Sequence, residues 1–305
     1  MVTLLQALLS GLALGGIYAL VALGFSITQT TTKTLNFGEG EFLVAGSFVA
    51  VGTLLLLAGK AQTGVLAVAD VTLPRYLLAL LASLVVLGIL GVVLYFAAVR
   101  PFFGSGGMSW VMSTIGFGII LQNTALAIWG PGSMSMPSPM GDGVIRIAGA
   151  GIRPQEILVL GVAGAVMLAL DHVLRRTKLG KAVRAVAANP AAAALMGINV
   201  GAIVVLAFVL SSGLAGLAGL LIAPITTASV FMGLAISLKA FSAAIVGGLT
   251  NPRGCIAGGF LLGCIEALVG LWRAEMREIT VFLLIILVLV VKPEGLFGRK
   301  PFEKV

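Results

Sequence analysis

The chain has 305 residues, of which 59% are hydrophobic and 10% are charged, and its formal net charge is +8. Soluble domains carry about 25% charged residues, so this composition indicates a protein of the lipid bilayer. The continuous apolar runs disfavour a membrane β-barrel, and the aromatic residues do not interleave with the basic ones as a nucleic-acid surface would require.

Nine apolar segments are candidate membrane helices, because a helix needs about 20 apolar residues to cross the hydrocarbon. In chain order they are residues 4–28, 38–58, 75–99, 109–130, 155–174, 200–223, 231–249, 254–272 and 278–292. The fourth contains Gln122 and Asn123 and the seventh contains Lys239, so these two are candidates for broken or re-entrant helices. We predict an all-α polytopic membrane protein of about nine transmembrane helices, with residues 1–305 forming one transmembrane domain.

The start of the second segment, "TLNFGEGEF", places polar residues and glycines where a membrane helix should begin. Non-helical backbone is tolerated at membrane depth where it lines protein or a water-filled cavity, so we expect a discontinuous helix start. Gly38 and Gly40 are expected to let the chain break, and Asn36 to cap the helix that resumes. Glu41 would then lie in a first helical turn and have a structural role, which leaves Glu39 as the residue of the translocation path.

Basic residues gather in two segments, the loop "HVLRRTKLGKAVRAVAANP" and the tail "VKPEGLFGRKPFEKV". Cytoplasmic loops retain Lys and Arg, so both segments should be cytoplasmic, and the four spans between them agree with this. Counting back places the N-terminus outside, Lys33 and Arg100 inside, and residues 59–74 and 131–154 outside. The alternating "VIRIAGAGIRP" predicts a small hairpin in the second external loop.

Four polar residues lie within the spans, where a polar or charged side chain is costly unless it has a partner or a function. Lys239 and Glu266 lie on consecutive spans joined by the tight "GGLTNPRG" turn, at similar depth, so an ion pair between them is geometrically feasible. The alternatives are a structural pair or a snorkelling lysine on one side, and a role in the transport path on the other. Gln122 and Asn123 are expected either to make interhelical hydrogen bonds or to line a cavity.

The basic loop, residues 175–199, contains a short Ala-rich stretch from Ala185 to Met196 that is interrupted only by Asn189-Pro190. Asn is a good N-cap and Pro is tolerated in a first helical turn, so Asn189 is expected to cap a short helix that ends at Gly197. Small alanine side chains favour close docking onto a protein partner over burial in lipid.

Enzymatic motifs are absent from the sequence. There is no GxxxxGK[ST] for ATP, no GxSxG and no HExxH. His172 is the only histidine, and the two cysteines, Cys255 and Cys264, fall on nearly opposite faces of one helix. We therefore expect no metal site and no catalysis in this chain.

Four stretches, in order along the chain, resemble the branched-chain amino acid (LIV-type) permease family of ABC importers. They are "SGLALGGIYALVALGFSI", "LNFGEGEFLVAGSFVA", "RAVAANPAAAALMGINV" and "LKAFSAAIVGGLTNPRGCIAGGFLLGCIEAL". The chain departs from the family at Glu39, where the family usually has His or Gln, near Asn189, where an acidic residue is often seen, and after Asn199, where a charged pair is usual.

The resemblance implies a permease subunit that moves a small polar solute, branched-chain or related amino acids above all, into the cytoplasm by alternating access. It implies a second permease subunit, two cytoplasmic ATPases that bind ATP and Mg²⁺, an extracytoplasmic solute-binding protein, contact with membrane lipid and location in the bacterial inner membrane. No cofactor is expected in this chain itself.

Two sets of site residues follow from these arguments. The expected translocation path comprises Asn36, Phe37, Gly38, Glu39, Gly40, Glu41, Gln122, Asn123, Lys239 and Glu266. The expected ATPase-coupling segment comprises Arg184, Asn189, Pro190, Leu195, Met196, Gly197, Ile198 and Asn199.

Three other functions are alternatives to this permease. A sugar- or nucleoside-type ABC permease should show a Gly-Gly-Ile-Asp-Leu-Ser-type element where this chain has "LNFGEGE". An ion-coupled secondary transporter or channel predicts two inverted halves, for which the chain gives little sign. A membrane-embedded enzyme would need a nucleophile or a metal set.

Overall fold

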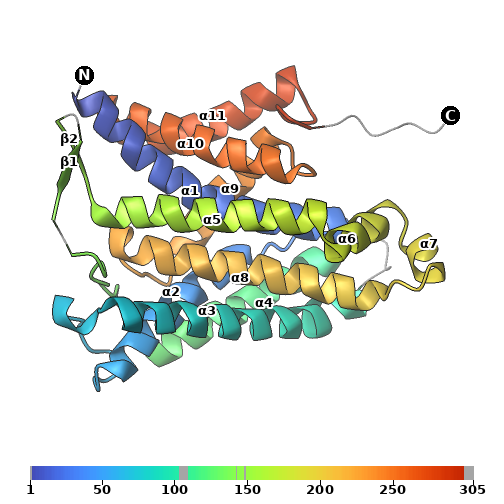
Figure 1. Cartoon of the computed structure of the whole chain (residues 1–305), viewed down its shortest axis with the longest axis horizontal. Helices are drawn as coiled ribbons and strands as arrows, with labels where there is room; N and C mark the ends of the chain where they lie inside the picture. The colour runs from blue at the N-terminus through green and yellow to red at the C-terminus, as the bar shows by residue number, and fades with distance from the viewer. Residues whose placement is uncertain (1, 103–108, 142, 148, 299–305) are drawn as a thin grey trace.

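The computed structural model describes residues 2–102, 109–141, 143–147 and 149–298. The long helices of this part are α1 (Val2–Thr32), α2 (Glu39–Leu57), α3 (Leu73–Leu94), α4 (Ser109–Trp129), α5 (Pro154–Arg176), α8 (Val200–Thr226), α9 (Met232–Gly247), α10 (Pro252–Trp272) and α11 (Met276–Val291). Shorter elements are η1 (Val68–Asp70), η2 (Tyr95–Val99), η3 (Arg100–Phe102), β1 (Ile145–Ile147), β2 (Ala150–Ile152), α6 (Lys178–Ala188) and α7 (Pro190–Leu195). Figure 1 shows the arrangement.

Each of the nine apolar segments found in the sequence coincides with a helix, so the all-α polytopic class is confirmed. Seven helices of the described residues are long and apolar enough to cross a membrane, whereas α9 and α11 have 16 residues each and are shorter. Of the two alternatives for the fourth and seventh segments, a broken or a re-entrant helix, the first is wrong, because α4 and α9 are each one continuous helix. Their polar side chains find partners without interrupting the helical backbone.

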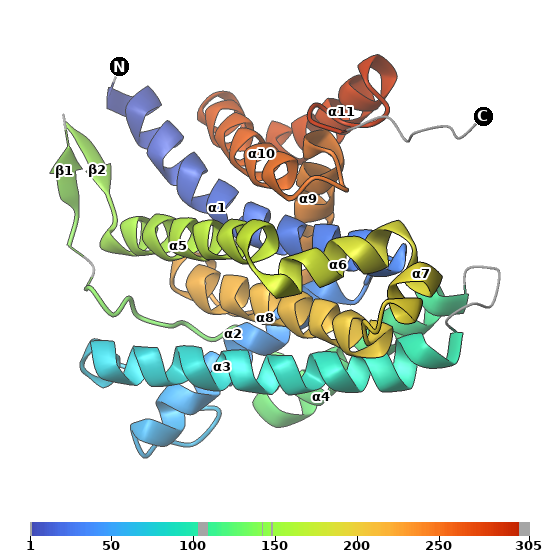
Figure 2. The ribbon, with the colours of Figure 1, turned by 45° about the vertical axis from the view of Figure 1, so that its right-hand side comes forward.

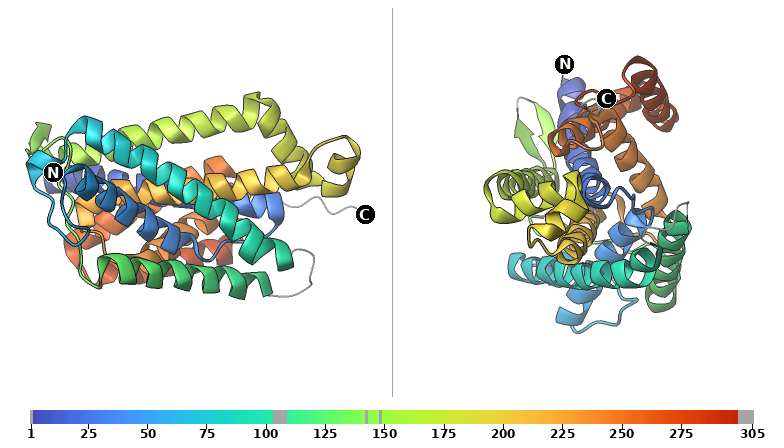
Figure 3. Two further views of the ribbon diagram at one scale, coloured as in Figure 1. Left: turned by 90° about the horizontal axis from the view of Figure 1, so that it is seen from below. Right: turned by 90° about the vertical axis from the view of Figure 1, so that its right-hand side faces the viewer.

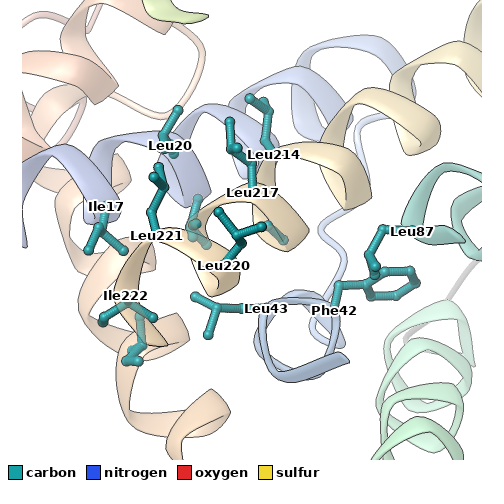
Figure 4. Packing of buried hydrophobic residues seen from close by; sticks show 14 of the residues in the cluster. Ile17, Leu20, Phe42, Leu43, Leu87, Leu214, Leu217, Leu220, Leu221 and Ile222 are labelled. Atoms are coloured by element: carbon teal, nitrogen blue, oxygen red, sulfur yellow. The ribbon is translucent and has the colours of Figure 1, made fainter. Parts of the chain in front are cut away.

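The interior of the bundle is built by α1, α2 and α8, which are the most deeply buried of the long helices. Figure 4 shows their contact, where Ile17 and Leu20 of α1 and Leu43 of α2 meet a row of leucines on α8. In contrast, α3, α4 and α5 keep most of their side chains at the surface. Their exposed residues are largely apolar, as lipid around them requires.

Glycine allows α1 and α10 to cross in close contact. A Cβ atom at Gly11 would lie 2.8 Å from the carbonyl oxygen of Gly263, and one at Gly15 would lie 2.8 Å from the Cα of Phe260. The small-residue spacing of both helices is therefore used for packing inside the chain. Figure 2 shows α9, α10 and α11 on one side of α1 and α8, with α3 and α4 on the other.

The two ends of the bundle differ. At one end the predicted hairpin is present, with β1 and β2 antiparallel, and a Cβ at Gly149 would lie 3.4 Å from Val2 near the N-terminus. At the other end lie α6 and α7, and Asn251 donates a hydrogen bond to the carbonyl of Phe297 near the C-terminus (Figures 1 and 3). The N-terminus and the basic loop are thus at opposite ends.

The loop between α2 and α3, at the hairpin end, is held by Lys60, whose ammonium lies 2.5 Å from the Asp70 carboxylate. This hydrogen bond from Lys60 holds the pKa of the Asp70 carboxyl below its usual range. Because both groups are solvent-accessible, the pair orders the loop and contributes little to overall stability.

Candidate functional site

The chain between α1 and α2 is non-helical from residue 33 to residue 38, as the polar sequence predicted. The expected cause is wrong in one respect. The left-handed residue is Lys33, with φ +58°, whereas Gly38 has φ −80° and Gly40 lies within α2. The glycines serve close packing instead: a Cβ at Gly38 would lie 2.8 Å from the Thr114 carbonyl oxygen of α4, and Gly40 abuts Gly233 of α9.

Asn36 is buried and organises the turn, but it does not cap α2. The N-cap position belongs to Gly38, which offers no side chain. Asn36 accepts a hydrogen bond from the Gly38 amide through Oδ1, at 3.1 Å, and donates one from Nδ2 to Glu39 Oε2, at 3.0 Å. The side chain therefore lies two residues before the N-cap and links the non-helical turn to Glu39, the first residue of α2.

Glu39 is fully buried, and both of its carboxylate oxygens have hydrogen-bond partners. Ser211 of α8 lies 2.8 Å from Oε1 and from Oε2, and Asn36 supplies the other donor. Gly24 of α1 leaves the space that the carboxylate fills. Sequence reasoning missed Ser211, although the pair Ser211-Ser212 in an otherwise apolar helix was a signal.

Glu41 has the opposite environment. Two residues along a helix turn the side chain by about 200°, so Glu41 faces away from Glu39. It is half-buried, lies against Gly118 of α4, and its Oε2 atom is buried without a hydrogen-bond partner in the described part of the chain. The geometry of the two carboxylates therefore favours the reverse of the roles expected from the sequence.

The other expected path residues of this region lie around α4 and α9. Phe37 is 40% exposed, and its ring lies 6.5 Å from that of Trp110 and 6.0 Å from that of Phe241. Gln122 lies one turn beyond Gly118 on α4 and donates to the carbonyl of Val230, at 3.3 Å. Asn123 is exposed and donates to the Ile119 carbonyl of its own helix, and it makes no interhelical hydrogen bond with the residues that the structure describes.

Lys239 of α9 and Glu266 of α10 form the ion pair that their depth suggested, with 2.7 Å between Nζ and Oε1. The second oxygen, Oε2, accepts a hydrogen bond from the Tyr18 hydroxyl of α1, at 2.9 Å. Three helices are thereby joined at one buried carboxylate. Tyr18 could not be paired from the sequence, because 248 residues separate it from Glu266.

The basic loop folds into α6 and α7. Asn189 caps α7 as predicted, because its side chain accepts from the Ala192 amide at 3.1 Å, and Gly197 follows the helix with φ +81°. Pro190 occupies the first turn, and Asn199 caps α8 in the same way. The interruption of the Ala-rich stretch at Asn189-Pro190 is thus a boundary between two helices, α6 and α7.

A small apolar core attaches this segment to α8. It consists of Val183, Val186, Ala193 and Ile203, with Ile198 packed against it, while Arg184 donates to the Leu174 carbonyl. Leu195 and Met196, by contrast, are 89% and 83% exposed at the tip. Two large apolar side chains that project from an otherwise anchored segment are typical of a protein-docking surface.

The described residues contain no group of three or more His, Cys, Asp or Glu side chains placed to hold a metal ion. The predicted site residues described above lie at the start of α2, on α4, in the buried ion pair and in the α6–α7 segment.

The chain is similar in sequence, over nearly its whole length, to known membrane permeases. A family model described as the permease component of the branched-chain amino acid transport system matches residues 7–291. The chain is 32% identical to the high-affinity branched-chain amino acid transport system permease protein BraD of Pseudomonas aeruginosa, with 99% of this chain and 98% of that protein covered.

The permease protein LivH of Escherichia coli K12, from a system of the same description, is also 32% identical, with 99% of this chain and 97% of that protein covered. The ribose import permease protein RbsC of the same organism is a weaker match, 28% identical over 77% of this chain and 72% of its own length. The chain belongs to the permease family of the branched-chain amino acid transport systems.

Proposed function

We propose that this chain is one transmembrane subunit of an ABC importer that carries branched-chain or related amino acids into the cytoplasm. The observation that carries the proposal is the family match over residues 7–291, which takes in the α6–α7 segment and all of the long helices apart from the first five residues of α1. A paired permease subunit, two ATPases and an extracytoplasmic binding protein complete the importer. ATP and Mg²⁺ are bound by the ATPases.

The substrate path is proposed to run beside α2, α4 and α9, with Glu41 as its carboxylate. A buried carboxylate oxygen without a donor carries a desolvation cost, which a positively charged group of the substrate or of the paired subunit would offset. The α-ammonium of an amino acid is such a group. Phe37 packs against Phe241 of α9, and Gln122 of α4 donates to the Val230 carbonyl just before α9.

Coupling to the ATPases is proposed to pass through α7. The exposed Leu195 and Met196 would sit in a groove of the ATPase, and the caps at Asn189 and Asn199 hold the tip rigidly enough to transmit its movement. Closure of the ATPases on ATP would then rock α8, to which the segment is anchored, and open the path alternately to each side.

The protein is a multi-pass membrane protein, and we place it in the inner membrane of a bacterium with its N-terminus outside. The basic residues Arg175, Arg176, Lys178, Lys181 and Arg184 support this orientation, since they gather at the α6 end of the bundle, which the positive-inside rule assigns to the cytoplasm. The hairpin end would face the binding protein.

Affinity purification of the tagged chain from native membranes tests the assembly. We expect an ATPase and a second permease subunit to co-purify in stoichiometric amounts. The cognate binding protein should then bind leucine, isoleucine or valine and not ribose, as measured by calorimetry. A preparation that carries out substrate transport without any ATPase would contradict the proposal.

A further inference from the structure

A cavity of about 1000 Å³ opens at the α6 end of the bundle, away from the proposed path. Its walls come from the last turns of α1, the end of α5, the middle of α6 and the turn between α9 and α10. The ion pair of Lys239, Glu41 and the exposed tip of α7 do not line this cavity.

Positive charge dominates this cavity. Four arginines line it, Arg175, Arg176, Arg184 and Arg253, against a single carboxylate, that of Asp171. Asp171 is engaged by Arg253, at 2.8 Å from each oxygen, and by Arg175 at 3.0 Å. Arg176 makes no ion pair or hydrogen bond with any described residue, so at least one guanidinium is available to a ligand.

Two hydroxyl-bearing residues of α1, Ser26 and Thr30, contribute to the wall of the same cavity. Their hydroxyl oxygens are buried within the protein, and neither makes a hydrogen bond with an oxygen or nitrogen of the described residues. The Cys255 thiol, a weak partner, lies beside Ser26. Buried hydroxyls of this kind normally have a partner, so two of them in one cavity indicate a ligand that accepts hydrogen bonds.

Part of the remaining wall is apolar, alongside the polar side chains of His172, Thr250 and Asn251. Ile27, Leu168 and Val183 contribute to it, and Leu168 is 73% exposed on the outer face of α5. A ligand with a negative head and an apolar body would match both parts of the cavity. Such a ligand is available at this depth, because the head groups of anionic lipids lie at the cytoplasmic surface of the membrane.

We propose that this cavity binds the phosphate head group of an anionic phospholipid, with Arg176 as the charged contact and Thr30, whose side chain turns toward the bound phosphate, as the hydroxyl donor. Guanidinium groups pair well with phosphate oxygens, and the hydroxyl adds a further donor to the same group. The acyl chains would leave the cavity along α5. A lipid in this position bridges α1, α5 and α6, and so connects the anchored segment to the bundle.

The test is a lipid titration of the purified full chain, followed by native mass spectrometry with phosphatidylglycerol and phosphatidylcholine as probes. We expect one phosphatidylglycerol to bind about tenfold more tightly than phosphatidylcholine, because only phosphatidylglycerol carries a net negative charge and one guanidinium is available to pair with it. Arg176→Gln should weaken the binding of phosphatidylglycerol about tenfold, and Thr30→Val should weaken it about threefold. Lys181→Gln, which removes a charge of the same loop outside the cavity, should leave binding within about twofold of wild type.

Equal binding of the two lipids, or equal effects of Arg176→Gln and Lys181→Gln, would overturn the proposal. Displacement of the lipid by inorganic phosphate at equal concentration would assign the cavity to a soluble anion. Crosslinking of residue 176 to the ATPase, with loss of the lipid from the complex, would assign it to that subunit. Thr30→Val leaves no unpaired hydroxyl, so it should fold at least as well as wild type and keep the test valid if Arg176→Gln does not fold.

Discussion

Lys239 and Glu266 form a buried ion pair with 2.7 Å between Nζ and Oε1, and Tyr18 donates to the other oxygen of the same carboxylate. The pair joins α9, which is too short to span a bilayer alone, to α10, and Tyr18 adds α1. Since charges within the membrane region need partners, this contact fixes how α9 sits in the bundle.

Removal of one partner of this pair should be worse than removal of both. Lys239→Met leaves a buried carboxylate unpaired, and we expect a loss of about 3–5 kcal/mol of stability. The double variant Lys239→Met with Glu266→Gln should recover much of it, because the amide still accepts from Tyr18. Thermal unfolding in detergent measures both. A double variant no more stable than the worse single one would show that the pair is not coupled, and Lys60→Met, at the exposed pair, is the control with little effect.

Substitutions at Glu39 should affect folding, whereas substitutions at Glu41 should affect transport. Glu39→Leu leaves Asn36 and Ser211 unsatisfied and should lower the yield of folded protein, at a cost of about 1–3 kcal/mol, whereas Glu39→Gln can keep both partners and should behave like wild type. The Glu41→Gln variant should fold normally. Its uptake at low substrate concentration should fall about tenfold, because one charge-assisted contact with the substrate is lost. Gel filtration and uptake assays distinguish the two. A transport defect in Glu39→Gln with normal uptake by Glu41→Gln would restore the opposite assignment.

Glycine at the crossing of α1 and α10 should be required for packing. Gly11→Ala would place a methyl group 2.8 Å from the Gly263 carbonyl oxygen, so we expect a net loss of about 1–3 kcal/mol. The matched control is Gly161→Ala on α5, where a Cβ atom meets nothing within 4 Å. Because alanine favours a helix by up to about 1 kcal/mol, the control should be neutral or stabilised. Thermal unfolding that ranks the two variants alike would contradict the role of close packing.

The tip of α7 should carry the contact with the ATPase. Leu195→Asp changes a side chain that is 89% exposed, so folding should be unaffected, while recovery of the ATPase should fall about tenfold because a charge replaces an apolar anchor. Val65→Asp, at an 80% exposed apolar position in the loop after α2, is the control and should leave recovery unchanged. Undiminished co-purification with Leu195→Asp would place the docking contact elsewhere.

Local patterns made the helices and the α7 cap predictable. Continuous apolar runs locate the nine segments, and Asn189-Pro190 signals a helix start through contacts only three residues away. The tight turn before α10 likewise made the depth of Lys239 and Glu266 comparable.

The long-range partners could not be predicted from such patterns. Ser211 lies 172 residues from Glu39, and only the packing of α8 against α2 brings them together. The roles of Glu39 and Glu41 depend on which side of one helix faces α8 and which faces α4, because the two positions differ by about 200°. That rotation is set by close contacts at Gly24, Gly40 and Gly118, which no local pattern reveals.

The most direct test of the account is uptake of labelled leucine into proteoliposomes that contain this chain, its paired permease subunit and the ATPases, with the binding protein added outside. We expect uptake that requires both ATP and the binding protein and that falls about tenfold with Glu41→Gln. Uptake driven by an ion gradient in the absence of ATP would contradict it.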